Sequence, residues 1–305
     1  DYLLPVPAKA KAWPTKGVGM CRFLAYIGAP IVMDKLLYQP VNSLIHQSYH
    51  ALERHDPVNA DGFGVGWYMP EIDPEPVLFT SIQPAWHNRN LRSLAPRTRS
   101  GCIFAHVRAA GTGEVSPRNC HPFQYKQFLM MHNGDIGGFG QIKRDLRERL
   151  SDEFFDWIKG ETDSEYFFAL FLDNLFKAHQ TEHHYSDIAD ALLRSIGDLK
   201  DLLACRGVKS ASYLNLAVTN GQCLIVTRYV TGSTKQPPTL YHSEGSRFEV
   251  VDGIPRMVQT GIQEHAILVV SEKLTEARED WHEVPRNHLI AVTEDLRVPL
   301  LPIVV

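Results

Sequence analysis

Strand-like and helix-like segments fall into separate runs along this chain instead of alternating one by one. Segments rich in β-branched and aromatic residues and bounded by Gly, Pro or Asn predict strands, at 21–28, 62–69, 75–82, 102–109 and 127–134. Apolar residues at helical spacing predict helices, at 137–150, 163–179 and 184–203. After about residue 210 strands return, at 211–219, 223–230, 239–243, 266–271 and 288–293. Segregated runs favour a layered α+β fold over a doubly wound parallel sheet.

Length and composition are those of an ordinary globular protein. The chain has 305 residues, of which 44% are hydrophobic and 22% are charged, so it can bury a substantial core as one large domain or two small ones. No internal repeat and no Gly/Ser linker divides it. We therefore expect one domain, at 21–305, whose strands come from both halves of the chain.

Charge and hydropathy indicate which partners to expect. A net charge of -4 gives no reason to expect nucleic acid or an anionic membrane surface as a partner. No apolar run approaches the roughly 20 residues that a membrane-spanning helix needs. Residues 1–20 are rich in Pro, Ala and Lys and lack the apolar centre of a secretory signal. A cytoplasmic location is therefore the expectation.

The cysteines are odd in number, widely spaced and without a CxxC pair, which argues against a disulfide framework or a zinc site. They are Cys21, Cys102, Cys120, Cys205 and Cys223. Cys102 and Cys223 lie in apolar strand-like runs, where a buried and unreactive thiol is expected. Cys21 also begins an apolar run, so composition alone is consistent with a core residue there.

Two further patterns resemble ligand sites but do not match them. The glycines of "GFGVGW" (62–67) do not follow the GxGxxG spacing of dinucleotide-binding loops and open no helix. His179, His183 and His184 lie close together in the sequence, but a solvated helix end accounts for them, and the chain has no HExxH motif. We expect neither a metal nor another cofactor.

Asn133 and Gly134 lie in the stretch "MHNGDI" (131–136), which admits two interpretations. Asn-Gly is a favoured turn dipeptide, so a tight turn after a strand is expected. Alternatively, the Asn133 amide and the Gly134 backbone N–H group could direct two donors at one oxygen, which is what an oxyanion hole requires. Glycine would let the backbone approach that oxygen closely.

The stretch "TDSE" (162–165) is typical of a helix start. Thr162 as N-cap and Glu165 three residues later fit a capping box before the apolar run 167–172. Capping explains most of this pattern. Asp163 would lie in the first turn of the helix, where its carboxylate could also face a cleft and bind an ammonium group.

Arg108 and His121 also have both a structural and a functional interpretation. Arg108 ends an apolar strand and precedes "AAGTG". It could be a surface arginine, or its guanidinium could grip a carboxylate with two hydrogen bonds. His121, in "NCHPF", could be catalytic or simply packed and hydrogen-bonded. No Ser-His-Asp arrangement is apparent.

Taken together, these groups suit one kind of substrate. They supply the Cys21 thiol, a guanidinium that can bind a carboxylate, a carboxylate that can bind an ammonium group, and two oxyanion donors. A substrate with an α-carboxylate, an α-ammonium group and an amide beyond them is a γ-glutamyl compound. The thiol still lacks a general base. Removal of residues 1–20 would expose the α-amine of Cys21, whose reference pKa of about 7.7–8.0 suits that role.

The ordered set of motifs resembles the class II glutamine amidotransferases of the N-terminal-nucleophile hydrolase superfamily. The motifs are "MCRF", "NADGFGVGWY", "FAHVRA", "NCHPF", "MHNGDI" and "TDSE". Within that class the chain is most similar to the short amidotransferases of thiol metabolism, namely the fungal glutathione-degrading subunit and the ergothioneine-pathway amidohydrolase. The resemblance covers roughly residues 20–302 and implies a four-layer αββα sandwich.

The same resemblance implies roles for individual residues. Cys21 would be the nucleophile, with its α-amine as the base, and Asn133 and Gly134 would form the oxyanion hole. Arg108 would hold the substrate α-carboxylate and Asp163 its α-amine. Residues 1–20 would then be a propeptide, a tag or a misassigned start.

The expected activity is hydrolysis of a γ-glutamyl amide through a Cys21 thioester. Glutathione or a related γ-glutamyl thiol is the expected substrate, with glutamine as a further candidate. The chain leaves no room for an acceptor domain, so we expect it either to hydrolyse its substrate outright or to act with a separate protein subunit. The alternative is a non-catalytic scaffold or regulatory subunit that keeps the fold but has Cys21 blocked.

Overall fold

The computed structural model of the chain describes residues 21–53, 58–111, 113–178, 182–232, 235–251, 254–259 and 264–305. The extension expected at 1–20 lies outside the described residues, as does His179. In the described part of the chain, no helix is both long enough and apolar enough to cross a lipid bilayer.

The first sheet carries the start of the chain at its centre. Its strands are β1 (Arg22–Val32), β2 (Phe63–Met69), β3 (Asp73–Ser81), β4 (Arg99–Val107), β9 (Tyr241–Gly245), β12 (Ala266–Val270) and β13 (His282–Glu283). Their order across the described sheet is β13-β9-β12-β1-β4-β2-β3. Neighbouring strands are antiparallel, and β1 pairs with β4 on one side and β12 on the other. Strands from both halves of the chain thus share this sheet.

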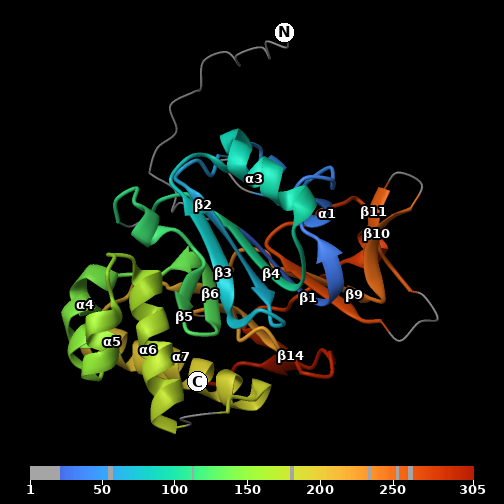
Figure 1. Ribbon diagram of the computed structural model, residues 1–305. Coiled ribbons are helices and arrows are strands. Elements are labelled where there is room, and N and C mark those ends of the chain that lie inside the picture. Colours follow the sequence, from blue (N-terminus) through green and yellow to red (C-terminus); the bar gives the residue numbers. More distant parts are fainter. Residues whose placement is uncertain are drawn as a thin grey trace.

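The second sheet is also antiparallel. Its strands are β5 (Phe123–Tyr125), β6 (Phe128–Asp135), β7 (Tyr213–Thr219), β8 (Leu224–Val230), β14 (His288–Val292) and β15 (Leu300–Pro302). They follow the order β15-β14-β8-β7-β6-β5. A separate hairpin is formed by β10 (Arg247–Val251) and β11 (Ile254–Val258), and it stands at the right of Figure 1.

Helices cover the outer face of each sheet. They are α1 (Asp34–Leu37), α2 (Leu44–Tyr49), α3 (Arg89–Leu94), α4 (Phe139–Glu148), α5 (Asp152–Trp157), α6 (Asp163–Ala178) and α7 (Tyr185–Cys205). Short 3-10 turns occur at Ala85–His87, Ala95–Arg97, Pro117–Asn119 and Arg278–Asp280. Figure 1 shows α1 and α3 at one end of the molecule and α4 to α7 at the other, with the strands between them.

The alternation of side chains along the strands builds three apolar layers. In β1, Phe23 and Ala25 enter the core between the two sheets, whereas Leu24 and Tyr26 enter the core under α1, α2 and α3. Leu129 of β6 likewise faces the space between the sheets, and its neighbours face α4 to α7. Successive strand residues point to opposite faces, so each strand contributes to two layers. The result is the expected four-layer αββα sandwich of the N-terminal-nucleophile type.

The predicted strands and the three long helices are present, and one local prediction is wrong. Asn133 and Gly134 form no turn, because β6 continues through them to Asp135 and pairs with β7. Tertiary pairing overrides the turn preference of Asn-Gly, since both residues have register partners in β7. The elements that the sequence did not reveal are short ones, such as α1, β5, β13 and β15, which have too few residues to show a periodicity.

Candidate active site

One narrow cavity gathers side chains from four separate elements. Cys21 immediately precedes β1, Arg108 follows β4, Gly134 belongs to β6, and Asp163 begins α6. All four line the same cavity. Asn133 is not among its lining residues. The structure therefore brings together four of the five predicted site residues and places the fifth directly behind them.

The Cys21 thiol lies against the residue that follows Arg108. The antiparallel pairing of Arg22 with Val107 puts the two strand ends side by side. The Ala109 backbone N–H group donates to Cys21 Sγ at 3.4 Å, and the Cys21 thiol donates to the Ala109 carbonyl oxygen at 3.6 Å. Cys21 is 8% exposed. Contacts in both directions with one backbone residue hold the sulfur at the wall of the cavity.

Arg108 is buried, so the interpretation as a surface arginine is wrong. Its backbone extends the pairing of β4 with β2, because its N–H group donates to the Gly62 carbonyl at 2.9 Å. The guanidinium donates from Nη1 to the Glu114 carbonyl at 3.1 Å and lines the cavity. A buried guanidinium with a fixed fork of donors is well suited to a carboxylate ligand.

Gly134 is required by the close approach of β7. A Cβ atom added at Gly134 would lie 1.9 Å from the Tyr213 carbonyl oxygen, which is far inside van der Waals contact. Asn133 is fully buried on the opposite face of β6, the face that Leu129 and Met131 turn toward β1. By the same alternation Cys21 shares the inward face of β1 with Phe23. The Asn133 side chain and the thiol thus occupy the space between the sheets.

Asp163 is held at the start of α6 by backbone donors. The Ile136 N–H group donates to its Oδ2 at 2.7 Å, and the Ser164 N–H group donates to its Oδ1 at 2.8 Å. The N-cap prediction is confirmed, because Thr162 Oγ1 accepts from the Glu165 N–H group at 3.2 Å. The reciprocal half of the capping box is wrong. Glu165 reaches further back and accepts from the N–H groups of Lys159 and Gly160.

Asp135 is a cavity residue that the sequence interpretation missed. It lines the cavity together with Asp163, and its Oδ1 is buried with no hydrogen-bond partner among the described residues. Burial and the negative charge of Asp163 raise the pKa of Asp135 to about 6. Its signal was present in the sequence, because an acidic residue directly follows Asn-Gly.

Two buried histidines, His121 and His132, also line the cavity, and burial favours their neutral form. His132 lies 2.8 Å from Ser164 Oγ through Nδ1 and 2.8 Å from the Tyr213 carbonyl oxygen through Nε2, and burial lowers its pKa. His121 packs its ring 4.2 Å from that of His106, and burial lowers the pKa of His121 well below its usual value. His121 is thus packed, but neither of its ring nitrogens has a hydrogen-bond partner among the described residues, so the hydrogen-bonded part of that interpretation is wrong. Among the described residues, no group of three or more His, Cys, Asp or Glu side chains is placed to hold a metal ion.

Sequence comparison shows the family to which this fold belongs. The family described as class-II glutamine amidotransferases matches residues 39–298, so the chain belongs to that family and is an enzyme of this class. It is 40% identical over 291 residues to the probable glutamine amidotransferase DUG3 of Saccharomyces cerevisiae, covering 90% of this chain and 82% of that protein.

A more distant relative is the γ-glutamyl-hercynylcysteine sulfoxide hydrolase of Mycolicibacterium smegmatis. It is 38% identical over 119 residues, covering 38% of this chain and 51% of that protein. Among solved structures, a glutamine aminotransferase class-II domain protein from Silicibacter pomeroyi superposes with a TM-score of 0.64 at 26% identity, over 93% of this chain and 100% of that one.

The glutamine phosphoribosylpyrophosphate amidotransferase of B. subtilis superposes with a TM-score of 0.59 at 14% identity, over 93% of this chain and 49% of that one. At this identity the likeness extends to the fold alone. The layered architecture is therefore shared with an amidotransferase that is about twice as long.

Proposed function

We propose that this chain hydrolyses γ-glutamyl amides through a thioester on Cys21. The observation that carries the proposal is the single cavity in which Cys21, Arg108, Gly134 and Asp163 meet. These residues come from four elements that lie far apart in the sequence. The cavity combines a thiol, a guanidinium for a carboxylate, a backbone N–H donor and a carboxylate for an ammonium group. These groups match the functional groups of a γ-glutamyl compound.

Substrate binding relies on the two charged side chains. The Arg108 guanidinium holds the α-carboxylate with two hydrogen bonds, and the Asp163 carboxylate holds the α-ammonium group. The cavity is narrow, so it takes the unbranched glutamyl arm and leaves the remainder of the substrate outside. In this pose the γ-carbonyl carbon lies beside the thiol.

Hydrolysis then proceeds in two stages. The α-amine of Cys21, in a chain that begins with this residue, takes the thiol proton. The Cys21 sulfur attacks the γ-carbonyl carbon, and the Asn133 amide and the Gly134 N–H group stabilise the oxyanion. The amine returns the proton to the leaving nitrogen and a γ-glutamyl thioester remains. Water, deprotonated by the same amine, attacks the thioester carbon, and glutamate leaves as the thiol is restored.

The substrate class follows from the relatives. One is named as a hydrolase of a γ-glutamyl thiol derivative, and another as a probable glutamine amidotransferase. Glutathione or a related γ-glutamyl thiol is therefore the proposed substrate, with glutamine as the second candidate. We assign residues 21–305 to this amidotransferase domain and propose that the residues before Cys21 are removed.

The test is glutamate release by protein made to begin at Cys21, with glutathione, glutamine and γ-glutamyl peptides as substrates. Cys21→Ala should abolish release, whereas Cys205→Ala, which removes an exposed thiol, should keep it. Substantial hydrolysis by the Cys21→Ala variant contradicts the proposal. Release by the isolated chain would also show that hydrolysis needs no second subunit.

A further inference from the structure

Two residues that follow β12, Ser271 and Glu272, contact the start of β1. The Ser271 N–H group donates to the Phe23 carbonyl at 3.1 Å, and the Phe23 N–H group donates to Ser271 Oγ at 3.1 Å. The serine side chain therefore takes the place of a backbone acceptor and continues the ladder between the strands. It holds the residue that lies two positions after Cys21.

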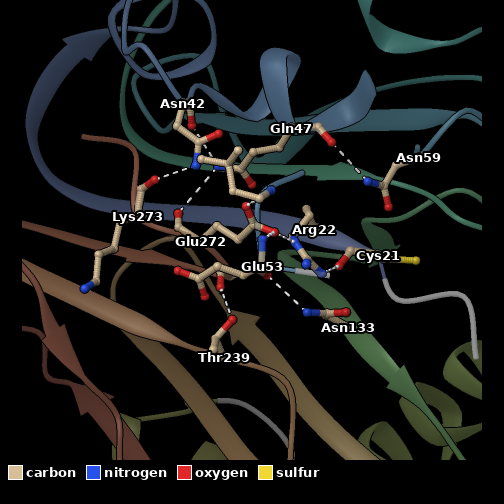
Figure 2. Close-up of polar contacts among 12 residues, drawn as sticks. Cys21, Arg22, Asn42, Gln47, Glu53, Asn59, Asn133, Thr239, Glu272 and Lys273 are labelled. Carbon is tan, nitrogen blue, oxygen red and sulfur yellow. Dashed lines mark hydrogen bonds and ion pairs between the residues drawn. The ribbon is translucent and has the colours of Figure 1, made fainter. Parts of the chain in front are cut away.

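Glu272 ties the same point to the backbone of Cys21. Its Oε1 accepts from Arg22 Nε at 2.5 Å, and Arg22 Nη1 donates to the Cys21 carbonyl at 2.9 Å. Figure 2 shows this chain of contacts from Glu272 through Arg22 to Cys21. Glu272 is fully buried and Arg22 is 2% exposed. Removing two charges from water is costly and is tolerated only where both are well hydrogen-bonded.

Further donors complete the environment of the Glu272 carboxylate. The Leu52 N–H group donates to Oε2 at 2.9 Å, and the Glu53 N–H group donates to Oε1 at 3.2 Å. The Thr239 hydroxyl donates to the Ser271 carbonyl at 3.0 Å. Ser271 and Glu272 are therefore held in place through their side chains and their backbone. Only a residue that is itself held in place can position another group.

Ser271 also reaches across to the second sheet. Its Oγ lies 3.3 Å from Asn133 Nδ2, whereas Asn133 Oδ1 is buried with no hydrogen-bond partner among the described residues. Figure 2 shows the amide nitrogen of Asn133 turned toward this dipeptide and its oxygen on the side of the view where the Cys21 sulfur lies. Both residues are fully buried, and a buried amide oxygen is normally hydrogen-bonded.

The serine hydroxyl can decide which end of the amide faces the thiol. Ser271 Oγ accepts from the Phe23 N–H group and from Asn133 Nδ2, so its own hydrogen remains to be donated. Half a turn of the Asn133 amide about its Cβ–Cγ bond lets Oδ1 accept that hydrogen. The same rotation puts the Nδ2 donors where the unpaired oxygen was.

We propose that Ser271 is a positioning residue for hydrolysis: its hydroxyl donates to Asn133 Oδ1 and thereby aims the Asn133 amide N–H group at the oxyanion. Glu272 anchors this serine to Arg22 and to the Cys21 backbone, so the nucleophile and the oxyanion donor keep one relative position. The inference rests on the proposed function, because it assigns Ser271 to the same reaction.

The first experiment measures steady-state glutamate release by Ser271→Ala in protein that begins at Cys21. Losing one oxyanion donor costs about 100- to 1,000-fold in kcat, so misdirecting it should cost tenfold or more. KM should stay within twofold, since Arg108 and Asp163 still hold the substrate. Unchanged kcat in a folded Ser271→Ala variant overturns the inference.

Ser100→Ala is the matched control. Ser100 is also a buried serine of the first sheet, and its hydroxyl donates to the Tyr68 carbonyl at 2.7 Å. It lies near the start of β4, at the opposite end of that strand from Arg108. This control should lower the melting temperature but leave kcat within twofold. An equal loss of kcat in both variants would mean a general effect on the sheet and would overturn the inference.

A double-mutant cycle separates positioning from structure. If Ser271 acts through Asn133, Ser271→Ala should lower kcat no further in an Asn133→Ala background. Equal losses in both backgrounds overturn the inference. Should Ser271→Ala not fold, Ser271→Thr and Ser271→Val form a second pair of similar shape that differs in the hydroxyl. Only the threonine variant should retain kcat, and equal activity of the pair overturns the inference.

The two proposals fail in distinguishable ways. If protein beginning at Cys21 releases no glutamate from any γ-glutamyl compound, the proposed function fails and the role of Ser271 fails with it. If that protein is active and the Ser271 variants match it, only the role of Ser271 is overturned.

Discussion

Asp135 and Asp163 are two carboxylates in one buried cavity, and the structure treats them differently. Asp163 accepts two backbone N–H groups, whereas Asp135 has a buried oxygen with no hydrogen-bond partner among the described residues. An unsatisfied carboxylate that destabilises the fold is typical of a functional site, where the ligand supplies the missing partner. At Asp135 the destabilising effect of a buried, unsatisfied carboxylate can be measured without a substrate.

Asp135→Asn should stabilise the protein at neutral pH. The pKa of Asp135 is raised to about 6 from its usual value of 3.8, so between these values the native state binds more protons than the unfolded state. The free energy of unfolding therefore falls as pH rises from the unfolded pKa of 3.8 through the folded pKa of about 6, and this contribution to stability is lost above pH 6. Thermal melts from pH 4 to pH 8 should show the variant melting above the wild type at pH 7.5, with the difference vanishing near pH 4.

Glu71→Gln is the control for the loss of a carboxylate, because Glu71 is exposed. It should melt with the wild type at every pH. A melting temperature for Asp135→Asn that stays below that of the wild type at pH 7.5 would mean that the Asp135 carboxylate stabilises the fold.

At the scale of the element, β6 positions the site because it pairs so closely with β7. Gly134↔Leu214 and Asn133↔Asn215 are partners in that pairing, and the backbone of Tyr213 leaves no room for a side chain at Gly134. The strand thus lines the cavity with Gly134 and turns the Asn133 side chain to the other face. A glycine that appears to mark a turn is here a glycine that permits close packing.

Gly134→Ala should separate β6 from β7 and disable the site. The added Cβ would meet the Tyr213 carbonyl oxygen at 1.9 Å, and overpacking of this kind costs about 1–3 kcal/mol. We expect a lower denaturant midpoint and at least a tenfold loss of glutamate release. Gly140→Ala on α4 is the control, since nothing lies within 4 Å of its added Cβ, and alanine favours a helix over glycine by about 0.5–1 kcal/mol. Equal stability of the two variants would refute the packing role of Gly134.

At the scale of the whole molecule, the proposed activity depends on whether Cys21 begins the chain. A peptide bond to Met20 turns the α-amine of Cys21 into an amide, which cannot take a proton near neutral pH. General-base catalysis contributes typically 100- to 10,000-fold. Protein that keeps residues 1–20 should therefore release glutamate at least 100-fold more slowly than protein that begins at Cys21.

This prediction is tested by placing a specific protease site directly before Cys21. Glutamate release is measured before and after cleavage, and mass spectrometry confirms the new first residue. The control is the same cleavage in a Cys21→Ala variant, which should not gain any glutamate release. Equal rates before and after cleavage would show that the α-amine is not the base.

Much of the layered fold could be predicted because strands and long helices carry their own local signals. Residues 163–179 have apolar side chains at helical spacing, and the helix observed there is α6. Short elements such as β13 have only two residues and carry no such signal. For the site, the combination of motifs and the resemblance to class II glutamine amidotransferases suggested Cys21, Arg108 and Asp163, although each also had a structural interpretation. Burial settled Arg108, because the sequence could not distinguish a surface arginine from one that lines a cavity.

The sequence by itself determined the local elements and the inventory of reactive groups, because both depend on residues within a few positions of each other. The tertiary structure decided which of these groups meet. Arg22 and Glu272 are 250 positions apart, and Asn133 and Ser271 are 138 apart, yet both pairs lie in contact. Contacts of this kind depend on strand register across two stacked sheets, which no local pattern records. The same register kept Asn133 and Gly134 in a strand and placed Asp135 in the cavity.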